Sequence, residues 1–288
     1  MKKTISVIYI LSFFFLCSCE NKIIRDQEGL IVYQENQISW IRNFEPLNPV
    51  SICRWPTRGG IYESLYLNNP ITTDWVPWLA TNYEWQNNNK KLLFTIRSEV
   101  QWSDGRAFSA HDVAYTLNLW KEYPALDTRN AWEYLKSVVA ISDTLVEVDF
   151  KRVYVPGFEA IAGAPIIPKH IWKELKDPLD FSNPNPVGTG PFTEILRFNS
   201  QVWELGKNHN YWQPGKPHIE KLIFPTFSSN EQTTLALLSG KLDYAGAFIP
   251  AIQRIFVDKD PEHHHYWFRN TGYSTFLHTN TKDPVLRD

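Results

Sequence analysis

The stretch Asn185-Pro186-Val187-Gly188-Thr189-Gly190-Pro191-Phe192 carries the most information about the fold of this chain. Two glycines and two prolines within eight residues exclude a helix or a strand interior, because proline lacks an N–H donor and glycine weakens regular structure. Strand-like sequence follows at 192–196 and 201–205. The stretch therefore predicts a loop with fixed turns that exposes bare backbone ahead of these strands.

The sequence around this loop mixes strand and helix patterns. Leu92, Phe94 and Ile96 alternate with other residues as in a strand, after a turn at 87–89. Ser109 followed by Asp112 is a helix-start signature. Further expected elements are the end of that helix at Pro124, a strand at 143–150, a short helix from Pro168 to Leu175, a helix capped by Ser229 and Gln232 and ended by Gly240, and strands at 242–248 and 273–279. Without a strict βαβ rhythm, this order favours an α/β protein with mixed sheets.

Several short motifs accompany the opening loop in a characteristic order. They are Thr95-Ile96-Arg97 with Trp102-Ser103-Asp104-Gly105, Phe108 and Asp112-Val113; Ile167 to Trp172; Asn208 to Pro217; Leu237 to Asp243; and Asn280 to Pro284. Together they resemble the family 5 extracytoplasmic solute-binding proteins of ABC importers, which include oligopeptide, dipeptide, nickel and cello-oligosaccharide receptors. The resemblance covers the chain from about Leu30 to its last residue and implies a periplasmic-binding-protein-like fold of type II.

The resemblance also implies a division of the chain. Lobe I is expected to be discontinuous, at 19–60 and 185–275, with an inserted subdomain at 61–184 and the start of lobe II at 276–288. Family members normally continue and close the second lobe, so we expect an amino-terminal portion with the second lobe largely missing. Residues 19–288 alone are then expected to bind ligand weakly, because such receptors enclose the ligand between two lobes.

The amino terminus reads as a lipoprotein signal peptide at 1–18. Lys2 and Lys3 give a positive start, and the apolar run from Thr4 to Leu16 is too short to span a hydrocarbon core of about 30 Å. Cys19 follows a small residue and is the predicted lipid anchor; the alternative is ordinary secretory cleavage near Ser18. Either way the protein is expected outside the cytoplasm. With Cys19 lipidated, it is expected as a lipid-anchored protein of the periplasm or of the outer face of the cytoplasmic membrane.

Composition excludes several function classes. The formal net charge is −2 with both signs interspersed, so no nucleic-acid partner is expected. After processing, Cys53 is the one remaining thiol, which excludes an internal disulfide and a cysteine metal site and suits a small buried residue. Twelve Trp beside one Met suggest aromatic surfaces in addition to core.

Catalytic and metal sites are not expected. The sequence has no Gly-x-Ser-x-Gly motif and no complete P-loop. The run at 263–265, three consecutive histidines, makes a poor chelate because consecutive side chains alternate in direction, and is interpreted as a solvated loop. Asp104 and Asp112 resemble a glycosidase pair, but a turn and a helix cap explain them better. No cofactor or metal is predicted.

By position, the resemblance places ligand-lining strips at 51–55, 246–248 and 273–278. The candidate ligand-binding residues are the stacking side chains Trp55, Phe248 and Phe276 and the polar anchors Arg54, Tyr273 and His278. The implied function is a substrate-binding lipoprotein that hands oligopeptides or similar small oligomers to an ABC permease with its ATPase. A cello-oligosaccharide receptor of the same family is an open alternative, and so is a nickel receptor. From another class, a secreted carbohydrate-active enzyme also stays open.

Overall fold

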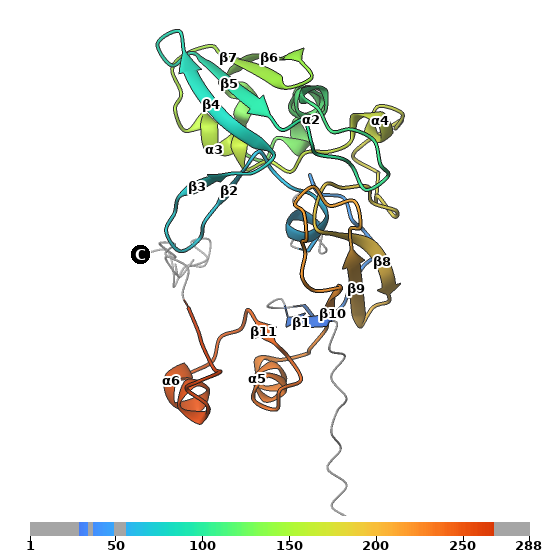
Figure 1. Ribbon diagram of the computed structural model, residues 1–288, viewed down its shortest axis with the longest axis vertical. Coiled ribbons are helices and arrows are strands. Elements are labelled where there is room, and N and C mark those ends of the chain that lie inside the picture. The colour runs from blue at the N-terminus through green and yellow to red at the C-terminus, as the bar shows by residue number, and fades with distance from the viewer. Residues whose placement is uncertain (1–28, 34–36, 49–55, 268–288) are drawn as a thin grey trace, which may run out of the picture.

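The computed structural model describes residues 29–33, 37–48 and 56–267, which form two β-sheets with helices packed on them (Figure 1). A five-stranded sheet combines a strand near the start of the chain with strands beyond residue 190, whereas a four-stranded sheet comes wholly from intervening residues. In Figure 1 the four-stranded sheet lies at the top and the five-stranded sheet below it. The expected α/β fold with mixed sheets is confirmed; the boundaries of lobes and subdomain stay predictions.

The five-stranded sheet joins distant parts of the sequence. It consists of β1 (Gly29–Tyr33), β8 (Phe192–Phe198), β9 (Val202–Lys207), β10 (Lys221–Pro225) and β11 (Tyr244–Ala245), in the order β11-β1-β10-β9-β8. β1 pairs in parallel with both β10 and β11, and the other pairs are antiparallel. In β9 the residues Trp203 and Leu205 point into the core and are fully buried, as the alternation of a strand requires.

The four-stranded sheet is a local antiparallel structure. Its strands are β4 (Ala80–Gln86), β5 (Lys91–Ile96), β6 (Leu135–Ser142) and β7 (Leu145–Phe150), in the order β4-β5-β7-β6. The hairpin of β2 (Tyr66–Asn68) and β3 (Trp75–Pro77) precedes it. The predicted turn before β5 is confirmed, since Asn87, Asn88 and Asn89 all have positive φ, a conformation that asparagine tolerates.

One long helix covers the four-stranded sheet. α2 (Ala110–Glu122) starts at the predicted capping box: the Ser109 side chain accepts from the helix backbone and Asp112 accepts from Ser109 N. The other helical segments are η1 (Thr57–Ile61, a π-turn), the 3₁₀ turns η2 (Pro124–Leu126), η3 (Ala131–Glu133) and η4 (Val257–Lys259), and the helices α3 (Gly157–Ala162), α4 (Lys169–Trp172), α5 (Asn230–Leu238) and α6 (Ile252–Ile255). Among the described residues no helix has the length and apolarity needed to cross a bilayer.

The loop with the two glycines packs directly against η1. Gly190 N donates to Ile61 O at 2.8 Å, and a Cβ on Gly190 would lie 2.2 Å from Gly60 O. A Cβ on Gly188 would lie 2.0 Å from Ile61 O. Both positions therefore need glycine because of close backbone approach. The sequence predicts that both glycines are needed, because of positive φ or close backbone approach, and the close approach is confirmed. It also predicts that Gly188→Val is worse than Gly190→Ala, because a residue before proline favours extended conformations that other residues can reach. That reason does not hold for Gly190, where the limit is the approach of Gly60 O.

The loop also docks on two of the sequence motifs. Ser103 N donates to Gly188 O at 2.9 Å, and Gly188 N donates to Ser103 Oγ at 3.3 Å. On the other side Asn208 Nδ2 donates to Gly190 O at 2.9 Å. The loop backbone is therefore hydrogen-bonded to the segment after β5 and to the segment after β9.

Three expected elements differ from the structure. The predicted strand 242–248 is shorter in the structure: the two residues of β11 pair with Val32 and Tyr33, and Gly246 N donates to Tyr33 O at 3.0 Å. The predicted helix 168–175 is α only as far as Trp172; the bonds that follow span three residues, as in a turn. Ser229 caps α5, but Gln232 Oε1 accepts from Ser228, so the capping box is half formed. The strand expected at 273–279 lies outside the described residues.

Candidate ligand-binding site

A small cavity lies where the segment before β2 meets the end of α2 and the end of α3. Its volume is about 50 Å³, room for a small group such as a carboxylate and not for a whole ligand. Two of its walls, Leu47 and Arg58, come from either side of the undescribed segment 49–55. The lining residues within the described part of the chain are Leu47, Arg58, Trp120, Leu126, Asp127, Thr128, Arg129, Ala160, Gly163, Ala164 and Pro165.

Arg58 is held in the cavity wall by backbone carbonyl groups. Its Nε donates to the Pro46 oxygen, and its Nη2 donates to the Leu47 oxygen at 3.2 Å. Because Arg58 lies in η1, whose residues Gly60 and Ile61 meet the 188–190 loop, its backbone is fixed as well. The guanidinium is therefore positioned by the fold, and its positive charge faces the same space that Leu47 lines.

Arg129 reaches the cavity from the exposed turn after η2. Its Nη1 donates to the Glu159 backbone oxygen at 2.8 Å. The neighbouring acid, Asp127, is buried, and its two oxygens accept from Ala131 N at 2.8 Å and from Trp132 N at 2.9 Å. Those two N–H groups stabilise the Asp127 carboxylate, so it caps η3 and does not pair with the arginines in the described structure.

The donor groups around the cavity exceed the acceptors. Within the described lining, Arg58 and Arg129 outnumber the one acidic residue, Asp127. The indole N–H of Trp120, a side chain 6% exposed, has no hydrogen-bond partner among the described residues. Arginine guanidinium groups bind carboxylate and phosphate in a bidentate, charge-assisted manner. Chemically, this arrangement suits a small anionic group entering from the side of Thr128 and Arg129.

A buried acid stands directly behind this wall. Glu45 is 1% exposed, and its carboxylate accepts from Leu47 N at 2.7 Å and from Asn48 N. Burial raises the pKa of Glu45 to about 7, although these two N–H donors and the Arg58 charge oppose that rise. Glu45 therefore changes its charge near neutral pH, one turn behind the cavity.

A second, larger pocket lies beyond β11. It measures about 470 Å³, and it is lined by Ala247, Phe248, Ile249, Pro250, Ala251, Ile252, Gln253, Arg254 and Asp258. Phe248 follows the carboxyl end of β11, where it is 68% exposed. Ligands of open α/β sheets bind beyond the carboxyl ends of parallel strands, and β11 runs parallel to β1. Nearby on the chain, Tyr244 packs on the exposed ring of Trp267 with centroids 5.8 Å apart.

Only one of the sequence-predicted ligand residues is placed by the structure. Phe248 is exposed in a pocket, as a stacking residue must be, but that pocket shares no lining residue with the Arg58 cavity. The other predicted residues lie outside the described part of the chain: Arg54, Trp55, Tyr273, Phe276, His278, the lipid anchor Cys19 and the thiol Cys53.

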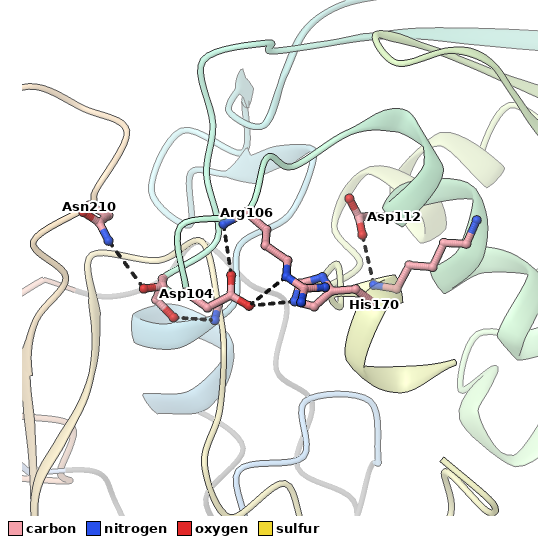
Figure 2. A network of polar contacts seen from close by, with 8 residues as sticks. Asp104, Arg106, Asp112, His170 and Asn210 are labelled. Carbon is pink, nitrogen blue, oxygen red and sulfur yellow. Dashed lines mark hydrogen bonds and ion pairs between the residues drawn. The ribbon is translucent and has the colours of Figure 1, made fainter. Parts of the chain in front are cut away.

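The acidic pair considered for catalysis is engaged in structural contacts. In Figure 2 the Asp104 carboxylate points at His170 and Arg106, with Asp104 Oδ2 2.8 Å from His170 Nε2. Asp112 lies apart and accepts from Lys169 N at 2.9 Å, besides capping α2. The two carboxylates thus have separate partners, which supports the turn and cap interpretation over a glycosidase pair.

The histidine run forms an irregular segment after η4. His263 pairs with Asp260 at 3.0 Å, and His264 stacks on Phe256 with ring centroids 4.1 Å apart. Within the described residues no group of three or more His, Cys, Asp or Glu side chains is suited to hold a metal ion. His263 and His264 therefore each contact a residue only a few positions earlier in the chain, which agrees with the interpretation of this run as a loop.

The sequence reasoning missed Arg58 and Arg129. They lie far apart in the chain, and neither belongs to a motif with a fixed spacing. The one available signal is the turn chemistry around Arg129, where Asn130 adopts φ 51° after the Asp127 cap. Turns that present an arginine at the surface are common, so the pairing of the two arginines appears only in three dimensions.

Comparisons with known proteins agree on one family. A sequence model described as "Bacterial extracellular solute-binding proteins, family 5 Middle" matches residues 74–288. The nickel-binding periplasmic protein of Escherichia coli K12 is 27% identical over 220 residues, which cover 71% of this chain and 40% of that protein. The oligopeptide-binding protein AppA of Bacillus subtilis is 27% identical over 158 residues, covering 52% of this chain and 28% of its own length.

A solved structure shares the fold. The mannohexaose-bound periplasmic oligopeptide-binding protein of Thermotoga maritima aligns with a TM-score of 0.75 at 26% identity, covering 85% of this chain and 46% of that one. The fold is therefore the mixed α/β periplasmic-binding-protein fold. The chain spans less than half the length of these relatives.

Proposed function

Because the chain belongs to the bacterial extracellular solute-binding proteins of family 5, we propose that it is the substrate-binding component of an ABC importer for oligopeptides or similar small oligomers. The family resemblance inferred from the motifs is confirmed. The family consists of binding proteins and not of enzymes, so the ligand is released chemically unchanged. In this proposal the protein hands the ligand to a permease that ATPase subunits drive.

The single observation that supports a peptide-like ligand is the pair of arginines in the small cavity. A peptide ends in a carboxylate, the group that a guanidinium binds through two parallel hydrogen bonds. Arg58 and Arg129 line one space of about 50 Å³, which admits that group. A neutral oligosaccharide has no charge to match theirs, so the cavity favours solutes with a carboxylate.

The test is a panel of binding measurements with the full-length mature protein. Titration calorimetry compares tri-alanine and penta-alanine, the same peptides amidated at the carboxyl end, cellotriose and a nickel–histidine chelate. We expect the free-acid peptides to bind and the amidated peptides to bind about 10- to 100-fold more weakly, which corresponds to one lost charge-assisted hydrogen-bonded contact.

Two arginine variants, one in the cavity lining and one outside it, test whether the cavity causes the preference for a free carboxylate. Arg129→Gln is expected to weaken free-acid peptides by about the same factor as amidation. Arg152→Gln is the control, because the Arg152 guanidinium lies over the Tyr134 ring at 4.9 Å and does not line the cavity. Equal affinities of the free-acid and amidated peptides, or equal losses in both variants, contradict the peptide proposal.

A second candidate function, an oligosaccharide receptor, has its own observation. Phe248 is 68% exposed and Trp267 is 55% exposed. Exposed aromatic rings of this kind stack on sugar rings. Cellotriose binding that Phe248→Ala abolishes and Arg129→Gln leaves unchanged supports this alternative over peptides. A reducing-sugar assay separates it from hydrolysis, because a receptor releases no new reducing ends.

The remaining assignments of the proposal concern the membrane and the ligand cleft. Cys19 is proposed as the diacylated anchor that tethers the protein outside the cytoplasmic membrane. The proposed ligand contacts outside the described residues are Arg54, Trp55, Tyr273, Phe276 and His278. Arg54 and Trp55 lie between Leu47 and Arg58 in the chain, both of which line the cavity, so these two assignments have the better support.

A further inference from the structure

A basic and aromatic surface lies where the chain leaves β7 and runs to α3. In Figure 1, β7 and α3 lie in the upper part of the molecule, whereas α6, which lines the larger pocket, lies at the bottom. We call it the 151–156 surface, and it consists of Lys121, Trp132, Tyr134, Lys151, Arg152, Val153, Tyr154 and Val155. None of these residues lines either pocket, so the candidate solute sites do not account for this surface.

Aromatic rings hold two of its cations in place. The rings of Tyr134 and Tyr154 stack with centroids 3.7 Å apart and planes 9° apart. The Arg152 guanidinium lies over the Tyr134 ring at 4.9 Å, and the Lys121 ammonium lies over the Trp132 ring at 5.0 Å. A ring positions a cation by its quadrupole and does not neutralise it. Both charges therefore stay available at the surface.

The cations of this surface have no acidic partner in the described part of the chain. Lys121, Lys151 and Arg152 are all exposed. Lys151 Nζ donates to two backbone oxygens, at 2.9 and 3.3 Å, and to no described carboxylate. The exposed acids that adjoin the surface in the sequence, Glu122 and Glu133, form no ion pair with these three cations. The surface is therefore positive and suited to an anionic partner.

Two apolar side chains stand exposed among these charges. Val153 is 48% exposed and Val155 is 52% exposed, on either side of the half-buried Tyr154. Their segment is fixed by the backbone, because Gly157 N donates to the Tyr154 oxygen at 3.0 Å and Phe158 N donates to the Val155 oxygen at 3.1 Å. A soluble anion would need only the cations. Apolar side chains beside Lys, Arg, Trp and Tyr are instead typical of segments at a membrane interface.

We propose that the 151–156 surface is a docking site for anionic lipid headgroups, which holds the protein against a bilayer outside the cytoplasm. The cations bind the lipid phosphates, the valines enter the boundary between headgroups and acyl chains, and the aromatic rings lie at the level of the headgroups. This contact depends neither on the captured solute nor on the proposed anchor at Cys19. Its failure would therefore leave the receptor proposal intact.

The first test is co-sedimentation of the full-length mature protein with lipid vesicles. The protein carries Cys19→Ala, so that no acyl chain contributes to binding. The vesicles are phosphatidylcholine alone, or an equal mixture of phosphatidylcholine and phosphatidylglycerol. We expect binding to the mixed vesicles, about tenfold less or weaker binding to the neutral ones, and a loss of binding in high salt. Equal binding to both compositions, or binding to neither, overturns the proposal.

Free glycerol phosphate distinguishes a lipid surface from a site for a soluble phosphate. It carries the phosphate of a lipid headgroup without the acyl chains. We expect an excess of it to leave the protein on the mixed vesicles. Displacement of the protein by glycerol phosphate would show a site for the soluble ion and would overturn the assignment to lipid.

Paired charge variants locate the contact. Lys121→Gln with Arg152→Gln removes two cations that lie over aromatic rings, and we expect vesicle binding to fall about 25-fold, since each cation near an anionic surface contributes about fivefold. Lys173→Gln with Lys176→Gln is the matched control, because these exposed lysines lie outside the surface, and we expect a loss below about threefold. Equal losses in the two pairs contradict a localised contact.

A valine pair tests the apolar part of the contact. Val153→Ser with Val155→Ser keeps every cation, and we expect vesicle binding to fall about tenfold, because the apolar area that enters the bilayer is lost. Unchanged binding of this pair would show attraction by charge alone and would overturn the docking site. Because the comparison of vesicle compositions uses no variant of this surface, a variant that fails to fold leaves that test in force.

Discussion

Replacing Gly190 with alanine tests the packing on which the whole arrangement depends. The added Cβ would lie 2.2 Å from Gly60 O and 2.7 Å from Ile61 O. Both atoms belong to backbone, so neither can swing aside as a flexible side chain does, and the loop must move until these contacts reach at least 3.0 Å. That displacement strains the bond from Gly190 N to Ile61 O and the bond from Asn208 Nδ2 to Gly190 O.

The cost is worked from these two effects. Overpacking in a rigid site costs about 1–3 kcal/mol, and a weakened buried hydrogen bond costs about 1–3 kcal/mol more. We therefore expect Gly190→Ala to lower the free energy of unfolding by about 2–6 kcal/mol. Gly188→Ala, whose Cβ would lie 2.0 Å from Ile61 O, belongs to the same class. Gly59→Ala is the matched control: its Cβ meets nothing within 4 Å, so we expect a change within about 0.5 kcal/mol.

Urea denaturation at pH 7, followed by tryptophan fluorescence, measures all three variants against wild type. Trp203 and Trp102 are fully buried on the two sides of this junction and report on its loss. A Gly190→Ala variant as stable as Gly59→Ala would refute the close-approach argument. Equal destabilisation in all three would show instead that any alanine near η1 is harmful, and the specific contact would not be the cause.

Three further predictions concern buried acids and the amino terminus. Glu63 is 5% exposed, and its carboxylate accepts hydrogen bonds from Trp78 Nε1, Tyr211 Oη and Trp212 Nε1 at 2.6, 2.8 and 3.0 Å. In Glu63→Gln the side-chain NH₂ points at one of these donors, so we expect urea denaturation to give a free energy of unfolding lower by about 2–4 kcal/mol. A loss below about 0.5 kcal/mol contradicts this. Because burial raises the pKa of Glu45 from 4.5 to about 7, its contribution to stability is complete below pH 4.5 and lost as pH rises through 7. Glu45→Gln should therefore flatten the fall in unfolding free energy between pH 5 and pH 8, by at most about 3 kcal/mol, and an unchanged slope argues against the assignment. Cys19→Ala should move the protein from the membrane to the soluble extracytoplasmic fraction, and a wild-type protein without acyl mass by mass spectrometry rejects the anchor.

Elements that depend on neighbours in the sequence were predictable. Ser109 and Asp112 lie within one turn of each other, so the start of α2 follows from their spacing alone. The turn before β5 follows from three consecutive asparagines. β11 was predicted too long, because its length depends on pairing with β1, which is more than 200 residues away in the chain, as the bond from Ile31 N to Asp243 spans 212 positions.

The buried polar contacts of Glu63 and the candidate site were harder to predict for the same reason. The donors to Glu63 are separated from it by 15, 148 and 149 positions, and no local pattern marks them. Arg58 and Arg129 likewise meet only because η1 and the turn after η2 pack together. The requirement for Gly190 was read from its own backbone preference, whereas the limiting contact is with Gly60. Long-range packing, which the sequence does not display, decides these features.

We propose that this family 5 protein captures a solute without changing it. To test this, the full-length mature protein is incubated with a mixture of short free-acid peptides and cello-oligosaccharides, the complex is isolated, and the bound and free molecules are identified by mass spectrometry. We expect enrichment of intact free-acid peptides on the protein, with the free pool chemically unaltered. Hydrolysis products in the free pool, or a protein that retains no solute from either class, would contradict it.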